Sequence, residues 1–446
     1  MTDYEFNPLH VLIVGGGFAG VACAKQLARD ESVRVTLFDK AGVHQFQPLL
    51  YQVATAELTP GDVTFDLNEL FRGQTNVQIQ PRDVVAVDPR EHTVTLADGG
   101  TISGDVLVLA AGAQPNFFDT PGASEFSYPL YSIGDAERVR SRVLQLYHDA
   151  AASPELIDDG ALNIVVVGAG ATGVEIGGAM AELVHDIMPK RYEAIEASAS
   201  RIIVVDLGHS PLGAFSDAAH AYATKQLDHR GVELMLGTSV AEVAPDHVTL
   251  SGETTIRTHL TIWGGGEKAA PIIADSGLPV GRGGRVDVRS DLSVAGFPGV
   301  YVIGDAANIP GADGDPLPQL GSVAQQSGAW AGRNILDDHV GIERTAFLYH
   351  DKGIMAMIGR RAAVAEIGEH RHELHGRIAF AAWLGVHAAL LSNIGAEMHA
   401  FMAWAEDFYV RPHHRSAALM DPSTIDTPRI AWGSHAQAPD NQPKDD

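Results

Sequence analysis

The chain has 446 residues, 45% of them hydrophobic and 20% charged, so it is long enough for two or three domains that together bury a large cofactor. Its formal net charge of −25 argues against nucleic acid as the main partner and against general attraction to anionic lipid, because both depend on clustered Lys and Arg. A single cysteine, Cys23, excludes an internal disulfide and fits a reducing cytoplasm.

Residues 1–17 lack the basic start and cleavage site of a secretory signal, and their apolar run predicts the first core strand. That strand leads through a GxGxxG turn into an Ala-rich helix. Gly15 allows the tight turn, Gly17 lets backbone N–H groups approach a pyrophosphate, and Gly20 lets the helix pack close to the strand. Asp39, at the end of the next strand, is placed to accept hydrogen bonds from a ribose. The alternative interpretation is a structural turn that binds no ligand.

The same strand, turn and helix recur from residue 163, and Asp206 ends the strand that follows. Two complete units imply two dinucleotides, and hydride transfer between FAD and NAD(P)H is the economical reason to hold both. An acid at position 206 favours NADH, because it would repel the 2′-phosphate of NADPH. Arg201 and His209 lie near it in the sequence and keep NADPH as the alternative. The turn glycines of this second copy are Gly168, Gly170 and Gly173.

β-rich stretches follow each unit, and VYVIGDAANIP at 300–310 predicts another strand, turn and helix. This passage lies too far along the chain to belong to the second unit, so we expect the chain to return there to the first domain. The predicted fold class is α/β, with two Rossmann-like dinucleotide-binding domains, the first interrupted by the second, and a C-terminal α/β region. The expected boundaries are 1–118 and 276–344 for the first domain, 119–275 for the second, 345–432 for the C-terminal region and 433–446 for a flexible tail.

The C-terminal region begins with a strand-like passage and continues with helical patterns over 377–394 and 396–410. Within it, residues 378–396 form an uncharged stretch of borderline length for a membrane span. His387 near the middle of this stretch and its small residues favour a packed or surface-lying amphipathic helix. The apolar face around Trp383 could dock on lipid, on a second subunit or on the core of the chain itself.

The passage HQFQPLLYQVATAELTPGDV, which starts at His44, is very similar to the segment that follows the first ribose acid in type II NADH dehydrogenases (NADH:quinone oxidoreductases). DVLVLAAGAQPNFF, GATGVEIGGAMAEL, VYVIGDAA and YHDKGIMAMIGRRAAVAEIG resemble successive blocks of that family, so the resemblance covers residues 9–415. It implies a flavoprotein whose FAD domain is interrupted by an NADH domain, with a C-terminal part for membrane association and dimer formation. It also implies hydride transfer from NADH to FAD and then two-electron transfer to a quinone, without proton pumping.

The resemblance implies roles for single residues. Asp305 looks like the acid that contacts the ribityl and phosphate region of FAD, and Glu175 looks like the glutamate beside the nicotinamide. Lys352 matches a lysine near the flavin and quinone end. For Glu175 the alternative is a first-turn acid that the helix dipole favours, and for Lys352 it is a surface salt bridge. The other expected cofactor-binding residues are Phe18, Ala19, Lys40, Gln47, Leu50, Ala111, Gly112, Ala171, Thr172, Gly304, Val323 and Ala324.

Two departures from the family pattern fall on the acceptor side. The family carries an AQxAxQ quinone-site motif, whereas residues 321–326 read GSVAQQ, so Ser322 replaces the first glutamine and Gln326 keeps the last. Gln319 could substitute for the missing glutamine. The C-terminal helices lack the basic residues that family members usually carry, which weakens attraction to anionic lipid. We expect Gln326, with the glutamate and lysine named above, to tune substrate binding and proton delivery.

The chain has no CxxC pair, which excludes the dithiol relay of disulfide-reductase relatives and the paired cysteines of sulfide:quinone oxidoreductases. None of the 20 histidines has the spacing of a metal site, so no metal is expected. Two other functions stay open: a soluble NAD(P)H:acceptor reductase or oxidase, and a redox-responsive FAD and NAD binding protein with little turnover. We expect a cytoplasmic homodimer that uses NADH and a quinone or other small acceptor and can contact the cytoplasmic face of the cell membrane.

Overall fold

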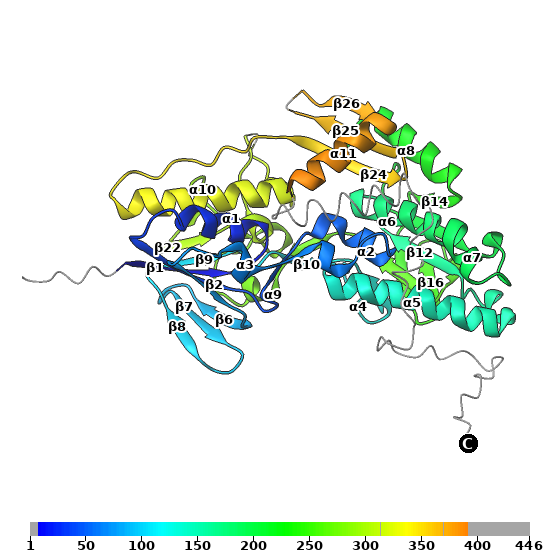
Figure 1. Cartoon of the computed structure of the whole chain (residues 1–446), viewed down its shortest axis with the longest axis horizontal. Helices are drawn as coiled ribbons and strands as arrows, with labels where there is room; N and C mark the ends of the chain where they lie inside the picture. The colour runs from blue at the N-terminus through cyan, green and yellow to red at the C-terminus, as the bar shows by residue number, and fades with distance from the viewer. Residues whose placement is uncertain (1–7, 313, 369, 391–446) are drawn as a thin grey trace, which may run out of the picture. The chain divides into compact units, whose positions relative to one another are not determined.

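The computed structural model describes residues 8–312, 314–368 and 370–390. It divides into two compact units, each built on one mainly parallel sheet (Figure 1). The expected α/β class with two Rossmann-like sheets is confirmed. The first unit comprises Met1–Gln45, Thr64–Gln114 and Glu267–Lys352, and the second comprises Phe46–Val63, Pro115–Gly266 and Gly353–Asp446.

A six-stranded sheet forms the centre of the first unit, in the order β21-β22-β9-β1-β2-β5. Neighbouring strands are parallel except β21 and β22, and β1 pairs with β2 from Leu9 opposite Val33 to Val14 opposite Phe38. The inner strands β1, β2, β9 and β22 are mostly apolar, as expected where helices and loops cover both faces of a parallel sheet. Their bounds are Leu9–Val14 (β1), Val33–Phe38 (β2), Val77–Gln80 (β5), Val106–Leu109 (β9), Ser293–Val294 (β21) and Phe297–Val302 (β22).

Helices α1 (Phe18–Leu27) and α10 (Gly321–His339) lie side by side in this unit (Figure 1). Gly328 permits the close approach, because a Cβ there would overlap the Ala19 carbonyl oxygen. Cys23 is buried on α1, and burial raises the pKa of its thiol to about 12, which leaves it a packing residue. A small antiparallel sheet completes the unit with β6 (Val84–Asp88), β7 (Thr93–Leu96) and β8 (Thr101–Ser103).

The second unit repeats the design with a five-stranded parallel sheet in the order β11-β18-β12-β13-β14. Helices α2, α5, α6 and α8 and an antiparallel sheet of β15, β16 and β17 accompany it. The sheet strands are Ser127–Pro129 (β11), Leu260–Trp263 (β18), Asn163–Val167 (β12), Arg201–Asp206 (β13) and Val232–Leu236 (β14). The remaining elements are Leu50–Ala54 (α2), Ile133–Ala152 (α5), Ala171–Glu182 (α6), Asp217–His229 (α8), Val240–Val243 (β15), His247–Leu250 (β16) and Thr255–Arg257 (β17).

An antiparallel sheet from the C-terminal part packs on α6 of the second unit. It consists of β24 (Gly353–Gly359), β25 (Ala362–Ile367) and β26 (His372–His375), and helix α11 (Arg377–Leu390) covers it. Gly178 on α6 makes the contact possible, because a Cβ there would overlap the Ile358 carbonyl oxygen.

The bounds of the two units are not those of the predicted domains. Residues 46–63 belong to the second unit because α2 packs on α5 and α6. The first unit breaks off at residue 114 rather than 118 and resumes at residue 267 rather than 276, and residues 353–390 belong to the second unit instead of forming a region of their own. The predicted helix over 396–410 and the tail at 433–446 lie outside the described residues.

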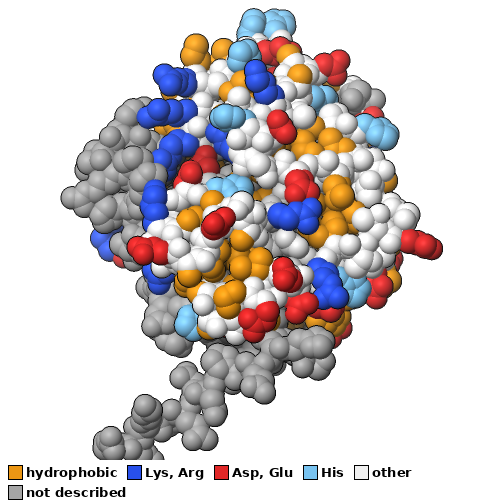
Figure 2. Space-filling view, turned by 90° about the vertical axis from the view of Figure 1, so that its right-hand side faces the viewer, with side chains coloured by type: hydrophobic (Ala, Val, Ile, Leu, Met, Phe, Trp, Pro, Cys, Tyr) orange, Lys and Arg blue, Asp and Glu red, His pale blue; other side chains and the backbone are white. Residues whose placement is uncertain are grey.

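The surface of the C-terminal helix is apolar in part. Ile378, Val386 and Leu390 are exposed on α11, whereas Phe380 and Trp383 are buried. No helix within the described part of the chain is long and apolar enough to cross a membrane. The face of the molecule in Figure 2 carries acidic and basic side chains with hydrophobic ones between them.

Candidate functional site

The glycine turn between β1 and α1 forms an open cradle in the first unit. Gly15 has a φ of +110°, and a Cβ there would meet the Ala110 backbone. A Cβ on Gly20 would overlap the Gly15 carbonyl oxygen, so strand and helix are as close as backbone allows. A Cβ on Gly17, by contrast, would have no heavy atom within 4 Å. Gly17 is the N-cap of α1, and no side chain caps this helix start, which is the arrangement that suits a pyrophosphate.

The turn between β12 and α6 repeats this geometry in the second unit. Gly168 has a φ of +101°, and a Cβ there would meet the Gly264 backbone. A Cβ on Gly173 would overlap the Gly168 carbonyl oxygen, whereas a Cβ on Gly170 would have no heavy atom within 4 Å. No side chain caps the start of α6. The two units therefore offer the same anion-binding backbone at equivalent positions.

The two predicted ribose acids bond to their own glycine turns. Oδ2 of Asp39 accepts the Gly16 N–H at 2.9 Å, and Oδ2 of Asp206 accepts the Ala169 N–H at 2.6 Å. Each carboxylate also accepts N–H groups from the loop that follows its strand. A carboxylate offers about four acceptor positions, so each acid keeps capacity for a hydroxyl. The predicted contact with a ribose stays a prediction.

Asp305 lies on the turn η7 (Gly304–Ala306) in a cradle of small residues. A Cβ on Gly304 would press on the Cβ atoms of Ala19 and Ala324, so the turn and both helix starts meet closely. Oδ1 of Asp305 is buried and has no hydrogen-bond partner among the described residues. Burial raises the pKa of this carboxyl to about 6, and the Arg285 charge acts in the opposite direction. A buried acceptor without a donor fits a ligand hydroxyl.

A second carboxyl beside Asp305 was not predicted from the sequence. Glu267 lies on β19 (Glu267–Ala269), which packs against η7. Burial raises the pKa of Glu267 to about 7, and the negative charge of Asp305 adds to the rise. The signal that could have indicated it was the GGGEKAAP passage, which places a charged pair where the family usually has a turn of small residues.

Glu175 projects from the first turns of α6 in the second unit and is only partly exposed. Its Oε1 accepts the Met357 N–H at 3.2 Å. Burial raises the pKa of Glu175 to about 8, while the Met357 N–H and the Trp383 indole favour the ionised form. The carboxyl is therefore a proton holder near neutral pH.

Aromatic side chains from two distant segments gather at Met357, the residue whose N–H donates to Glu175. The Tyr51 hydroxyl donates to the Met357 sulfur at 3.3 Å, and the Tyr51 ring meets Trp383 edge-on with centroids 6.4 Å apart. Trp383 stacks on His387 with centroids 3.9 Å apart. Of the three docking surfaces considered for Trp383, its own unit's core is the one observed. Sequence reasoning did not place any of these residues near the glutamate.

The predicted acceptor residues are tied to the segment at 342–352 of the first unit. The Gln326 amide donates to the His350 carbonyl at 3.1 Å and accepts the His350 N–H at 3.0 Å. Ser322 shares a hydrogen bond of 2.9 Å with the Tyr349 hydroxyl. Lys352 is exposed and forms no ion pair with a described residue, which disfavours the salt-bridge alternative.

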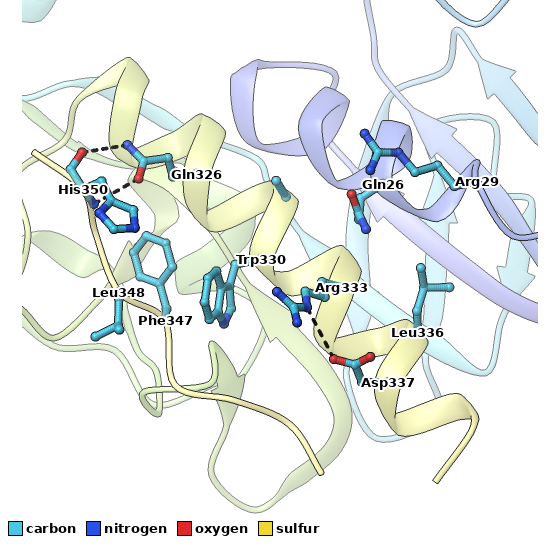
Figure 3. Close-up of a pocket in the computed structure, with 11 residues that line it drawn as sticks. Gln26, Arg29, Gln326, Trp330, Arg333, Leu336, Asp337, Phe347, Leu348 and His350 are labelled. Atoms are coloured by element: carbon cyan, nitrogen blue, oxygen red, sulfur yellow. Dashed lines mark hydrogen bonds and ion pairs between the residues drawn. The ribbon is translucent and has the colours of Figure 1, made fainter. Parts of the chain in front are cut away.

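A cavity of about 640 Å³ lies beside Gln326, between α1, α10 and the segment at 347–350 (Figure 3). It contains none of the predicted cofactor-binding residues, so it is separate from both cradles. Arg333 and Asp337 form an ion pair along one wall at 3.7 Å (Figure 3). The lining residues are Gln26, Arg29, Gln326, Ala329, Trp330, Arg333, Leu336, Asp337, Phe347, Leu348 and His350.

The remaining predicted cofactor-binding residues divide between the two units. Those in the first unit surround its glycine turn or follow β2 and β9, and they are Phe18, Lys40, Ala111, Gly112 and Val323. Ala171 and Thr172 are exposed at the start of α6. Gln47 and Leu50 belong to the second unit, where the Gln47 amide donates to the Tyr131 carbonyl at 3.3 Å and Leu50 is buried.

Residues 9–328 match the pyridine nucleotide-disulphide oxidoreductase family model. The chain is 34% identical to the type II NADH:quinone oxidoreductase NdhA of Mycobacterium tuberculosis, over 91% of this chain and 88% of that protein. It is 33% identical to Ndh of the same organism, over 89% and 88%. Its fold resembles that of NDH2 from Plasmodium falciparum in complex with NADH, with a TM-score of 0.83, 18% identity and coverage of 91% of this chain and 99% of that one.

Proposed function

The chain belongs to the type II NADH:quinone oxidoreductase family, and we propose that its first glycine turn holds FAD and its second holds NADH. The chain is an FAD-dependent enzyme that oxidises NADH and reduces a quinone. The observation that carries the assignment of the two turns is their repeated geometry. In each turn the first glycine has a positive φ, and a Cβ on the last glycine would overlap the carbonyl oxygen of the first. A Cβ on the middle glycine would meet no heavy atom within 4 Å, which leaves room for a pyrophosphate.

Asp305 supports the first turn as the flavin side. Its buried Oδ1 atom lacks a donor among the described residues, and a ribityl hydroxyl would supply one. The small residues Ala19, Gly304 and Ala324 let the backbone approach such a ligand closely. When bound there, FAD supplies hydride acceptance and two-electron delivery, so no protein side chain has to act as a nucleophile.

Proton balance gives Glu175 its proposed role. NADH releases a hydride, which carries two electrons and one proton, whereas reduction of a quinone to a quinol consumes two electrons and two protons. One proton must therefore come from solvent through the protein. Glu175, whose pKa is raised to about 8 by burial, holds a proton at neutral pH and stands on the helix that begins at the proposed NADH turn.

The proposed roles on the acceptor side follow from the hydrogen bonds of the first unit. Gln326 pairs with both backbone groups of His350, so it holds the segment that leads to Lys352. Lys352 then presents a free ammonium group, which would stabilise negative charge that develops on a quinone oxygen. Ser322 and Tyr349 form a hydroxyl pair where the family has a glutamine.

The proposed location is the cytoplasmic face of the cell membrane, with the enzyme as a homodimer. The exposed apolar side chains Ile378, Val386 and Leu390 on α11 support contact with lipid or with a second copy. Without a basic cluster on this helix, we expect the apolar contact rather than charge to provide most of the affinity.

The matched variants Gly17→Val and Gly170→Val test the assignment of the two turns. A Cβ at either position meets no protein atom within 4 Å, so the fold should tolerate both, while each blocks its own pyrophosphate. We expect Gly17→Val to lack FAD. We expect Gly170→Val to keep FAD but to lose rapid flavin bleaching when NADH is added anaerobically in a stopped-flow spectrometer.

The same instrument tests the acceptor. Wild-type flavin bleached by NADH should recover rapidly when a menaquinone or ubiquinone analogue is added. Recovery with oxygen alone would contradict a quinone acceptor, and full FAD content in Gly17→Val would contradict the assignment of the first turn.

A further inference from the structure

Gly16, inside the first glycine turn, is held at both of its backbone groups. Its N–H donates to Oδ2 of Asp39 at 2.9 Å, and its carbonyl oxygen lies 3.0 Å from Nδ1 of His44. A carbonyl oxygen can only accept, so Nδ1 of His44 carries a proton and donates it. Two side chains from outside the turn therefore fix this residue.

The imidazole of His44 is closely packed. Only 1% of the residue is exposed. It lies on β3 (Val43–Gln45), which pairs with β4 (Thr64–Asp66), and the centroids of the Phe18 and Phe65 rings are 5.1 and 6.2 Å from its own. Burial lowers the pKa of His44, so the ring is neutral at pH 7 and carries one N–H, which the bond to the turn places on Nδ1.

The bond from His44 sets the direction of the next amide group. In a trans peptide the C=O of one residue and the N–H of the next point in opposite directions. With the Gly16 carbonyl oxygen held by His44, the Gly17 N–H points to the opposite side of the turn. This N–H has no acceptor among the described residues. The turn thus keeps one uncommitted donor, whose direction is set by the bond from His44.

The second glycine turn fixes the equivalent peptide with a different donor. Ala169 stands where the first turn has Gly16. Its N–H donates to Oδ2 of Asp206 at 2.6 Å, and its carbonyl oxygen accepts the Leu212 N–H at 2.7 Å. Leu212 is buried with a φ of +59°, which few residues other than glycine adopt. The Gly170 N–H again has no acceptor in the described part of the chain. Because both units hold this carbonyl by unrelated means, its direction matters for what the turns bind.

We propose that His44 is a positioning residue for FAD: its imidazole holds the Gly16 carbonyl so that the Gly17 N–H donates to the pyrophosphate. The inference rests on the proposed assignment of FAD to the first glycine turn. An independent sign of a ligand there is the buried Oδ1 of Asp305, which has no donor among the described residues, on a turn that meets α1 at Ala19. Without the His44 donor the peptide can rotate, and the pyrophosphate loses one aligned N–H.

The test compares His44→Asn with His44→Leu. Asparagine and leucine have nearly the same shape and leave the same space beside the phenylalanines, but only the asparagine amide can donate from the position of Nδ1. FAD affinity is measured from the flavin fluorescence released when each holoenzyme is diluted. We expect His44→Asn to stay close to the wild type and His44→Leu to bind FAD about 10- to 100-fold more weakly, the effect of one hydrogen bond to a charged group. Equal affinities of the two variants would overturn the proposal.

Phosphorus NMR of the FAD-saturated proteins locates the effect. We expect the resonances of the bound pyrophosphate to match the wild type in His44→Asn, and one of them to move in His44→Leu. Weaker FAD binding with unmoved resonances would place the loss elsewhere and would also overturn the proposal. His185→Leu is the control, because Nδ1 of His185 lies 3.1 Å from the Arg230 carbonyl oxygen in the second unit. It removes the same kind of bond and should change neither measurement.

Gly17→Val separates the possible failures. If this variant keeps its full FAD content, the assignment of the first turn fails. If it lacks FAD while His44→Leu binds FAD as tightly as the wild type, the inference about His44 fails alone. If His44→Leu does not fold, His44→Gln replaces it, because its longer side chain carries the same amide past the position of Nδ1. His44→Asn should then bind FAD more tightly than His44→Gln, and the reverse order or equal affinities would contradict the role of His44.

Discussion

Replacement of Glu175 by glutamine should change how stability depends on pH. Folding raises the pKa of this carboxyl from 4.5 to about 8, chiefly by burial, so the folded state holds the proton more tightly than the unfolded state. The stabilisation linked to that proton is fully present below pH 4.5 and is lost as the pH rises to 8. The amide of the Glu175→Gln variant does not titrate in this range, so the stability of that variant should not follow this trend.

The size of the effect follows from the shift. The free energy of unfolding falls by about 1.36 kcal/mol for each pH unit between the pKa of Glu175 in the unfolded state and its pKa in the folded state. Because the slope flattens near each pKa, the wild type should lose roughly 3.5 kcal/mol relative to Glu175→Gln from pH 5 to pH 8. Urea unfolding of the two FAD-loaded proteins at pH 5, 6.5 and 8, followed by circular dichroism, measures this difference.

An exposed acid provides the control for this experiment. Glu125 lies on α4 (Ala123–Phe126) of the same unit and is exposed. The difference between the wild type and Glu125→Gln should stay constant with pH. If the difference for Glu175→Gln is equally constant, the carboxyl is not desolvated and the reasoning about its proton is refuted.

Three further predictions concern the cofactor sites and the acceptor side. Asp206→Ala should lower kcat/KM for NADH by about 10- to 100-fold, because it removes a charged acceptor for the ribose hydroxyls. The ratio of kcat/KM for NADH to that for NADPH should fall as well, and an unchanged ratio would contradict this role. In the wild type, retention of FAD during dialysis should weaken below pH 6, where Asp305 becomes protonated, and in Asp305→Asn it should be weak at every pH. Gln326→Ala should lower the free energy of unfolding by about 1–2 kcal/mol, measured by urea titration, because it loses both hydrogen bonds to His350; equal stability would show that the pair is not maintained in solution.

The glycine turns could be predicted from sequence because their causes are local. A positive φ at Gly15 and Gly168 and the contacts of Gly20 and Gly173 involve nearby turn backbone, so the spacing alone indicates the geometry. The return of the chain to the first unit was predicted from the strand, turn and helix pattern at 300–310, which lies too far along the chain to belong to the second unit. The role of Asp39 could be stated only as an expectation, since its carboxylate also bonds the turn itself.

The surroundings of Glu175 could not be predicted, because they come from segments far apart in the chain. Tyr51, Met357 and Trp383 meet only after α2, β24 and α11 have packed on the second unit. The apolar pattern of α11 indicated a buried or docking face and gave no information on which partner it meets. Gln326 is the opposite case: a motif indicated its importance, while its hydrogen bonds tie it to His350.

Gly178 limits which segments of this protein could be exchanged with those of a relative in a chimera. Because α6 and β24 touch through backbone at Gly178 and Ile358, any side chain there would force the strand away. A chimera that exchanged only residues 115–266 would place α6 of one protein against β24 of the other. The two elements would then pack only if their contacting surfaces matched. The exchangeable module therefore spans three pieces of sequence, 46–63, 115–266 and the described part of the chain from 353 onward, and crossover points belong at residues 45, 114, 266 and 352.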